Sequence, residues 1–298
     1  MNTFDDIMNV TGFAKVQAAA PAQPTATPPK QAKEDDFNLE AWKEEQQNLR
    51  NRLFADLDEV TAALLAGQVS IQQYLDMQAQ FLDYSVSNAL LILAQNPKAS
   101  KIGTVRFWKD AGAKLQDSAQ HLYILEKGHA YQRADGNIAT GYNPVKVYDI
   151  AQTNVKQNPN RQSFSQRALL SGVIKDYPGK MTVVDELPRP VVVNEQNDIL
   201  YLRGMEFEQG FAFVTHAVAH LRLQEKNPKT ADCKAWCAAY LLCQKTGTEF
   251  AVNLDWSKLT PQTDGDLKHF RKELKDIHRV ASDLYDNIQA AAKAEATS

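Results

Sequence analysis

A long apolar stripe runs through the last part of the chain. Between residues 263 and 294, large apolar side chains recur every three or four positions, which is the period of an α-helix. The stripe consists of Leu267, Phe270, Leu274, Ile277, Val280, Leu284 and Ile288. This spacing predicts a long amphipathic C-terminal helix with one face available for packing.

The segments before this helix mix helix and strand patterns. In the first half we predict helices over 39–67, 70–95 and 105–115, and strands within 121–132 and 146–155, with a Lys-Gly break at Lys127. In the second half we predict a helix over 164–177, strands within 181–186, 190–195 and 197–204, and helices over 205–225 and 230–247. The pattern is typical of an α+β protein. A polar segment with a proline, 157–161, divides it into domains over 37–156 and 157–298.

The first 36 residues have a different composition from the rest. Residues 16–36 are rich in Ala, Pro, Thr and Gln and nearly lack large apolar residues, which predicts a disordered linker. Before it, residues 1–15 carry apolar side chains at helical spacing, namely Phe4, Ile7, Met8, Val10 and Phe13. This segment is either a frayed tail or a docking peptide for a protein partner.

The composition excludes several classes of protein. The 298 residues carry a formal net charge of −3, so any nucleic-acid site must be a local basic patch. No stretch approaches the roughly 20 apolar residues of a membrane helix, and the N-terminus has no secretory signal pattern. The three cysteines all lie between 233 and 243, too close together for a disulfide framework. We therefore expect a cytoplasmic protein without a membrane partner.

One basic patch is visible in the first half. Five cations fall within residues 98–114 with aromatic side chains between them, namely Lys98, Lys101, Arg106, Lys109 and Lys114 around Phe107 and Trp108. Proteins that bind single-stranded DNA combine cations for the phosphates with aromatic rings for the bases. Trp108 and Phe107 are either such stacking surfaces or core residues, and the lysines either bind phosphate or form a solvated face.

The order of motifs around this patch resembles the N-terminal domain of ArdC-type antirestriction proteins. The matching positions are Tyr84, Ser85, Asn88, Gln95, Asn96, Pro97, Trp108 and Lys109, followed by Tyr148, Asp149 and Gln152. The resemblance covers about residues 40–155 and implies single-stranded DNA as a partner and an origin in a plasmid, conjugative transposon or phage. The nucleic-acid-binding residues it suggests are Tyr84, Asn88, Lys98, Lys101, Arg106, Trp108, Lys109 and Lys114. Where the family has a basic, glycine-rich turn, this chain has QDSAQH at 116–121.

A histidine pair stands out in the second half. His216 and His220 are four residues apart, so both imidazoles lie on one helix face and could share a metal ion. In H-E-x-x-H peptidases the residue after the first histidine is a glutamate that activates the zinc-bound water. Ala217 stands there in this chain and cannot move a proton.

The surrounding residues resemble the zincin-like domain of the same mobile-element proteins. In that resemblance, Trp236 stands where an acidic third ligand is expected, which implies an inactive scaffold without a cofactor. Several alternatives remain open: a zinc metallopeptidase whose glutamate was removed at Ala217 or is supplied by Glu206, Glu208 or Glu225, or a protein-interaction adaptor. Zinc could bind weakly to His216 and His220 with Asp232, or structurally if Cys233 and Cys237 complete a four-ligand site.

Overall fold

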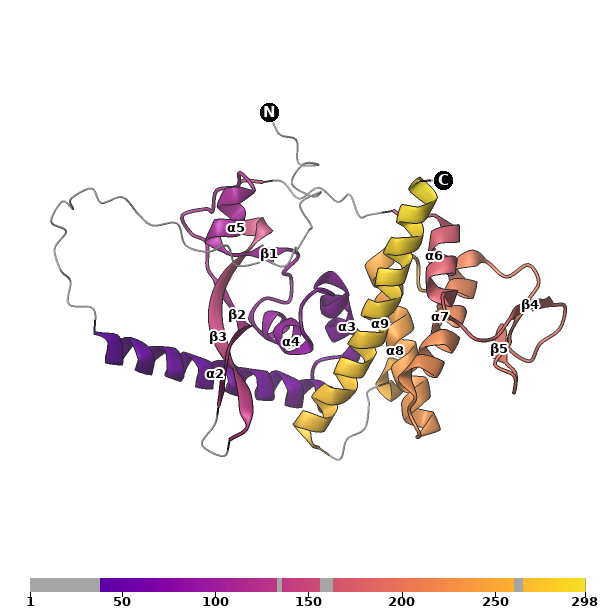
Figure 1. Cartoon of the computed structure of the whole chain (residues 1–298), viewed down its shortest axis with the longest axis horizontal. Coiled ribbons are helices and arrows are strands. Elements are labelled where there is room, and N and C mark those ends of the chain that lie inside the picture. The colour runs from indigo at the N-terminus through magenta and orange to yellow at the C-terminus, as the bar shows by residue number, and fades with distance from the viewer. Residues whose placement is uncertain (1–37, 133–135, 156–162, 260–264, 298) are drawn as a thin grey trace.

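Two small sheets are embedded in a mostly helical chain (Figure 1). The computed structural model describes residues 38–132, 136–155, 163–259 and 265–297. The predicted linker, the N-terminal docking segment and the polar boundary at 157–161 lie outside these residues. The prediction of an α+β fold with a long C-terminal helix is confirmed. Among the described residues, no helix is long and apolar enough to cross a membrane.

The first half begins with a helical layer. It contains α2 (Leu39–Leu65), α3 (Ile71–Gln80) and α4 (Val86–Gln95). The prediction of one helix over 70–95 was wrong, because the chain leaves the helix at Phe81. The amide of Gln78 donates to the carbonyls of Phe81 and Tyr84, and the Ser85 side chain caps the start of α4. Periodicity alone does not reveal such a break, since the apolar positions resume in nearly the same phase.

A twisted ribbon follows these helices. Strands β2 (Leu122–Gln132) and β3 (Ile138–Asp149) pair antiparallel, and the short β1 (Ile102–Gly103) pairs with the end of β3. The Lys-Gly break is a β-bulge within β2, where Gly128 and His129 lie opposite the single residue Gly141. The helix predicted over 105–115 is shorter, because α5 (Val105–Asp110) ends before Gly112, whose φ is +73°.

The second half carries its own sheet and helices. Strand β6 (Ile199–Leu202) lies between β4 (Met181–Val184), to which it is parallel, and β5 (Val191–Val193), to which it is antiparallel. The helices are α6 (Gln166–Ile174), α7 (Phe207–Leu223), α8 (Pro228–Thr246) and α9 (Leu267–Ala296). Asn227 caps α8 at one end and Gly247, with a φ of +77°, ends it at the other.

The two halves share one hydrophobic core (Figure 1). The predicted apolar stripe of α9 is buried in this core from Phe270 to Ile288. Helix α9 packs on α6, α7 and α8 and also on α2 and α4 of the first half. The contact with α6 is close, since a Cβ on Gly172 would lie 2.5 Å from the Cα of Ile288. The division into domains near residue 157 stays a prediction.

Candidate functional site

Trp108 anchors helix α5 to the ribbon. Its side chain is 2% exposed and lies in a small core with Ala113 and Ile150, and its indole N–H donates to the carbonyl of Tyr148 at 2.9 Å. Thr104 caps the start of the helix by accepting from the N–H of Phe107. Of the two interpretations of Trp108, the structure therefore places the ring in the core.

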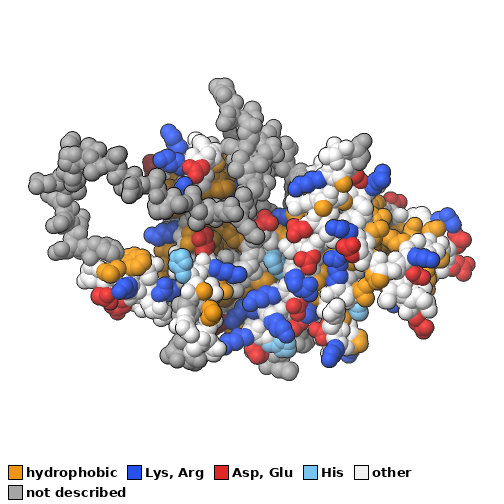
Figure 2. All heavy atoms as spheres, in the orientation of Figure 1, with side chains coloured by type: hydrophobic (Ala, Val, Ile, Leu, Met, Phe, Trp, Pro, Cys, Tyr) orange, Lys and Arg blue, Asp and Glu red, His pale blue; other side chains and the backbone are white. Residues whose placement is uncertain are grey.

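The neighbouring residues form an exposed basic surface. Phe107 is 37% exposed, and its ring lies over Gly103, where a Cβ would be 2.1 Å from the ring. The Lys101 ammonium lies 5.8 Å from the centroid of the Phe107 ring, and burial lowers the pKa of Lys101. Arg106 and Lys109 are exposed on the same helix. We call Lys101, Arg106, Phe107 and Lys109 the α5 surface, and Figure 2 shows cationic side chains beside hydrophobic ones at this place.

The remaining predicted DNA-binding residues are dispersed. Asn88 is 7% exposed, and its amide donates to the carbonyl of Leu125 and accepts from its N–H, so it ties α4 to β2. Tyr84 is half-buried with its ring 5.7 Å from that of Phe81, and burial raises the pKa of its hydroxyl. These side chains lie between elements rather than on the α5 surface.

Two further lysines of the patch are exposed. Lys98 follows α4 and lines a hollow of about 290 Å³ that also includes Asp76 and Gln80. Lys114 follows α5, and its backbone N–H donates to the Asn154 side chain at 2.7 Å. Both therefore lie on segments that flank the α5 surface in the sequence, and their ammonium groups are open to solvent.

The histidine pair lies where α7 meets α8. The imidazole of His216 stacks on the indole of Trp236, with ring centroids 4.0 Å apart and planes 22° from parallel. Its Nε2 lies 3.0 Å from Oδ1 of Asp232, one turn before Trp236 on α8. The centroid of the His220 ring is 6.1 Å from that of His216. Trp236 also packs edge-to-face on Phe213, which joins the histidine to the aromatic packing of the second half.

The packing around the histidine pair shifts the pKa values of Asp232 and His220. The hydrogen bond from His216 lowers the pKa of Asp232, and the charges of His216 and His220 act in the same direction. Burial lowers the pKa of His220, and the neighbouring His216 lowers it further, while Asp232 partly opposes the shift. Asp232 is therefore held ionised beside His216, and His220 takes up a proton less readily than a free histidine.

The structure does not bring the two cysteines into one group with the histidine pair. The thiols of Cys233 and Cys237 both lie against the carbonyl of Leu259, in the buried part of α8, so the four-ligand site left open by the sequence is not formed. The described part of the chain contains no group of three or more His, Cys, Asp and Glu side chains that could hold a metal ion. Trp236, the residue that the resemblance aligns with the acidic ligand, stacks on His216 instead of offering it an oxygen.

The three glutamates that the sequence offered in place of a base at Ala217 lie at or beyond the ends of α7. Glu206 and Glu208 stand at the start of α7, and His216 is eight positions after Glu208, which is about 12 Å along the axis. Glu225 lies past the other end of α7, with its carboxylate 3.4 Å from the Lys234 ammonium. Ala217 itself is buried in the helix packing.

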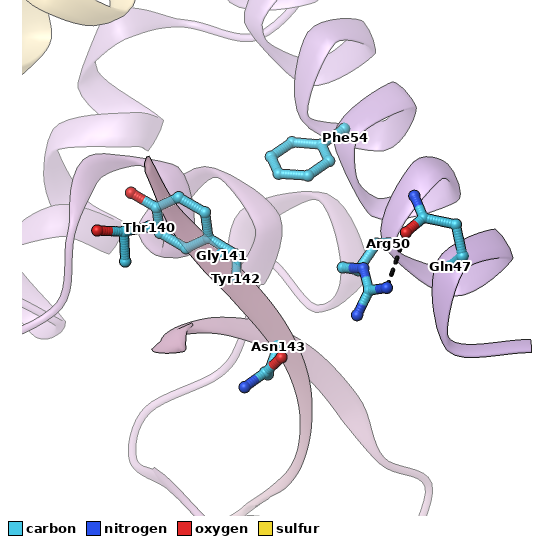
Figure 3. A pocket seen from close by; sticks show the side chains of 7 residues that line it. All are labelled: Gln47, Arg50, Phe54, Thr140, Gly141, Tyr142 and Asn143. Atoms are coloured by element: carbon cyan, nitrogen blue, oxygen red, sulfur yellow. Dashed lines mark hydrogen bonds between the residues drawn. The ribbon is translucent and has the colours of Figure 1, made fainter. Parts of the chain in front are cut away.

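A hollow that the sequence did not suggest lies between α2 and β3. It has a volume of about 580 Å³, and its walls include Arg50 and Phe54 from α2 and Tyr142 from β3 (Figure 3). Arg50 and Phe54 are one turn apart on a helix, but Tyr142 is 88 residues beyond Phe54. Because the two walls are so far apart in the chain, no pattern of neighbouring residues reveals this hollow.

The fold is similar to that of known antirestriction proteins. The structural class that emerges is an ArdC-like α+β fold, as the resemblance predicted. The crystal structure of the metal-free antirestriction protein ArdC from plasmid R388 matches with a TM-score of 0.52, covering 80% of this chain and 97% of that chain at 12% identity. The Mn(II)-bound structure of the same protein matches with a TM-score of 0.50 at 14% identity, with the same coverage. No protein-family model matches this sequence, and no curated protein does.

Proposed function

We propose that the chain is an antirestriction-type protein of a mobile genetic element that binds single-stranded DNA in the host cytoplasm. The observation that carries this proposal is the α5 surface, where the exposed Phe107 ring lies beside Lys101 and shares its helix with the exposed Arg106 and Lys109. A ring of this kind can stack on a base, and the cations can follow the phosphates. The fold shared with the R388 antirestriction protein supports the biological setting.

An oligonucleotide titration tests this proposal. The labelled strand is measured single and in duplex form at two salt concentrations, with the full chain and with a triple variant, Lys101→Gln, Arg106→Gln and Lys109→Gln. If each cation meets one phosphate, the slope of log affinity against log salt becomes shallower by roughly 2 in the variant.

The control removes the same charge from another surface. Lys268, Lys272 and Lys275 are exposed on one side of α9. Changing all three to Gln should leave the salt slope as it is in the parent protein. Equal losses in both triple variants would mean that only total charge matters, and an unchanged α5 variant would mean that DNA binds elsewhere.

For the second half we propose an inactive, peptidase-like scaffold. The stacking of Trp236 on His216 supports this role, because an aromatic ring that packs on a histidine cannot supply a metal ligand. Ala217 also removes the general base, whose contribution to rate is typically about 10² to 10⁴-fold. Two independent defects, in metal capture and in chemistry, therefore oppose peptide hydrolysis.

Metal analysis tests the scaffold proposal. The protein is freed of metal, dialysed separately against Zn²⁺ and against Mn²⁺, the ion named for one R388 structure, and then assayed for bound metal. We expect less than one tightly held ion per chain and no cleavage of a denatured protein substrate. One tightly held ion that is lost in His216→Ala or His220→Ala would show that α7 is a metal centre after all.

A further inference from the structure

We propose that the hollow between α2 and β3 holds one unstacked base of the bound single strand. This inference rests on the proposed DNA binding and adds a second contact site to the α5 surface. The walls come from two elements that are distant in the sequence. Helix α2 contributes Gln47, Arg50 and Phe54, and strand β3 contributes Thr140, Gly141, Tyr142 and Asn143. The volume of about 580 Å³ is within the range of ordinary small-molecule pockets, which is ample for a nucleotide.

Two aromatic rings in this pocket are exposed. Phe54 is 42% exposed and Tyr142 is 40% exposed, and their centroids lie 6.4 Å apart with the planes nearly perpendicular. Figure 3 shows the rings next to each other across the gap between the helix and the strand. A flat base can therefore stack on the open face of one ring while the edge of the other ring contacts its rim.

The charge of the pocket favours an anionic ligand. Arg50 is half-buried and donates to Oε1 of Gln47 at 2.7 Å. Among the described residues no carboxylate lies within ion-pair distance of Arg50, and none lines the pocket. A guanidinium held beside two rings without a counter-ion suits the phosphate next to a stacked base. An apolar peptide would instead leave this charge without a partner.

The backbone of the ribbon adds polar groups. Strand β1 pairs only with Tyr148 and Asp149, so the described residues place no strand against the outer edge of β3 near Gly141. Such an edge presents N–H and C=O groups to a ligand. The bulge at Gly128 and His129 lies directly opposite Gly141, and bulges change the direction of side chains beside binding sites. The side-chain amide of Asn143 packs against Gly128, since a Cβ added to Gly128 would lie 3.0 Å from the amide nitrogen.

The pocket and the α5 surface lie at two places along the same ribbon. Strand β3 reaches from the pocket at Tyr142 to Asp149, beside α5, and seven residues of strand span about 23 Å (Figure 1). Binding sites of single-strand binders extend over several nucleotides. A single DNA strand can therefore contact both the pocket and the α5 surface. Lys146 is exposed on β3 between these two places.

Five single variants of the full chain, two of them controls, separate the aromatic contribution from the charge. Phe54→Leu and Tyr142→Ser should each weaken single-strand binding between about fivefold and about a hundredfold without changing the salt slope. Tyr142→Phe keeps the ring and should bind like the parent. Arg50→Gln should make the salt slope shallower by about 0.7, whereas Arg52→Gln, on another face of α2, should not. Because these side chains are at the surface, unchanged thermal midpoints confirm that the variants fold.

Photocrosslinking identifies the contact directly. An oligonucleotide that carries 5-iodouracil is irradiated on the parent protein, and the modified peptide should contain Tyr142 or Phe54. If the parent binds the strand but the pocket variants bind it equally and no crosslink falls in the pocket, this inference is wrong and the proposed function stands. Equal weakening on duplex DNA would also overturn it, because paired bases cannot reach the rings. If the parent binds no single strand, the proposed function itself fails.

Discussion

The α5 surface and the α7–α9 region use the same kinds of side chain in opposite ways. On α5 the cations are exposed to solvent, and Trp108 is the residue of this helix that is buried in the core. In the second half the Lys234 ammonium is 1% exposed and is enclosed by three carboxylates, those of Glu225, Glu273 and Asp276. His216 is likewise held between Asp232 and Trp236.

This difference separates two meanings of a charged or aromatic motif. A cation in solvent costs little and remains available to a ligand, whereas a buried cation is stable only with its partners. The H-x-x-x-H spacing is present, yet the His216 side chain is packed between Asp232 and Trp236. A motif in the sequence therefore indicates which side chains share a helix face, and the neighbouring helix decides whether they remain available for chemistry.

The largest effect should come from breaking the buried cluster. Burial lowers the pKa of Lys234, but its hydrogen bonds with Glu273 and Asp276 outweigh burial and raise the pKa, so the residue is charged. Lys234→Ala would remove the ammonium beside Glu273, which is 5% exposed, and leave that carboxylate with only the His269 imidazole, whose Nε2 lies 3.1 Å from Oε1. We expect a loss of about 3–5 kcal/mol in the free energy of unfolding, measured by urea denaturation.

Two further variants sharpen this result. Lys229→Ala, on an exposed position of the same helix, should change the free energy of unfolding by less than about 0.5 kcal/mol. Lys234→Met combined with Glu273→Leu replaces both charges with apolar side chains and should recover much of the loss. If Lys234→Ala unfolds at the same urea concentration as the parent, the cluster does not stabilise the fold.

The sequence predicted elements well and contacts poorly. The positions of α6 to α9 and of the three strands in the second half follow from periodicity to within a few residues. The break between α3 and α4 depends on the Gln78 amide reaching two carbonyls, which periodicity does not encode. Local patterns thus determine where elements lie, but not every interruption.

The candidate sites show the same limit. Trp108 and Phe107 are adjacent in the sequence, yet one is buried under Tyr148 and the other is exposed, because they leave the helix in different directions. The pocket joins Phe54 to Tyr142, and only the packing of α2 against the ribbon brings them together. Sequence reasoning therefore listed the side chains of the α5 surface but not their arrangement, and it did not find the pocket.

A smaller effect is expected at Asn88, which was one of the predicted DNA contacts. Asn88→Ala removes both hydrogen bonds to the backbone of Leu125 and leaves that buried N–H and C=O without partners. We expect about 2 kcal/mol of lost stability. The affinity of the folded variant for a single strand should stay within about twofold of the parent. A twofold change corresponds to about 0.4 kcal/mol, which is less than the roughly 1–3 kcal/mol expected for the loss of a contact with a base. Asn48→Ala, at an exposed position on α2, is the control.

The smallest effect concerns the pH dependence of the histidine pair. Because burial lowers the pKa of His220, the folded protein binds a proton there more weakly than the unfolded chain does. The contribution of His220 to stability is therefore complete above the unfolded pKa of about 6.5 and is lost as the pH falls below it. The lowered pKa of Asp232 acts in a separate window, because its contribution is lost only as the pH falls below the ordinary aspartate pKa.

His220→Gln isolates the first window. The imidazole is only partly buried and the residue is exposed overall, so solvent screening should limit the effect to roughly a few tenths of a kcal/mol. We expect the difference in urea midpoint between parent and variant to change between pH 7.5 and pH 5.5, with the parent losing more stability on acidification. A parallel fall in both proteins would assign the loss to other groups. A parent that became more stable at pH 5.5 relative to the variant would mean that protonated His220 gains a partner in the folded state, most directly Asp232 across the α7–α8 contact.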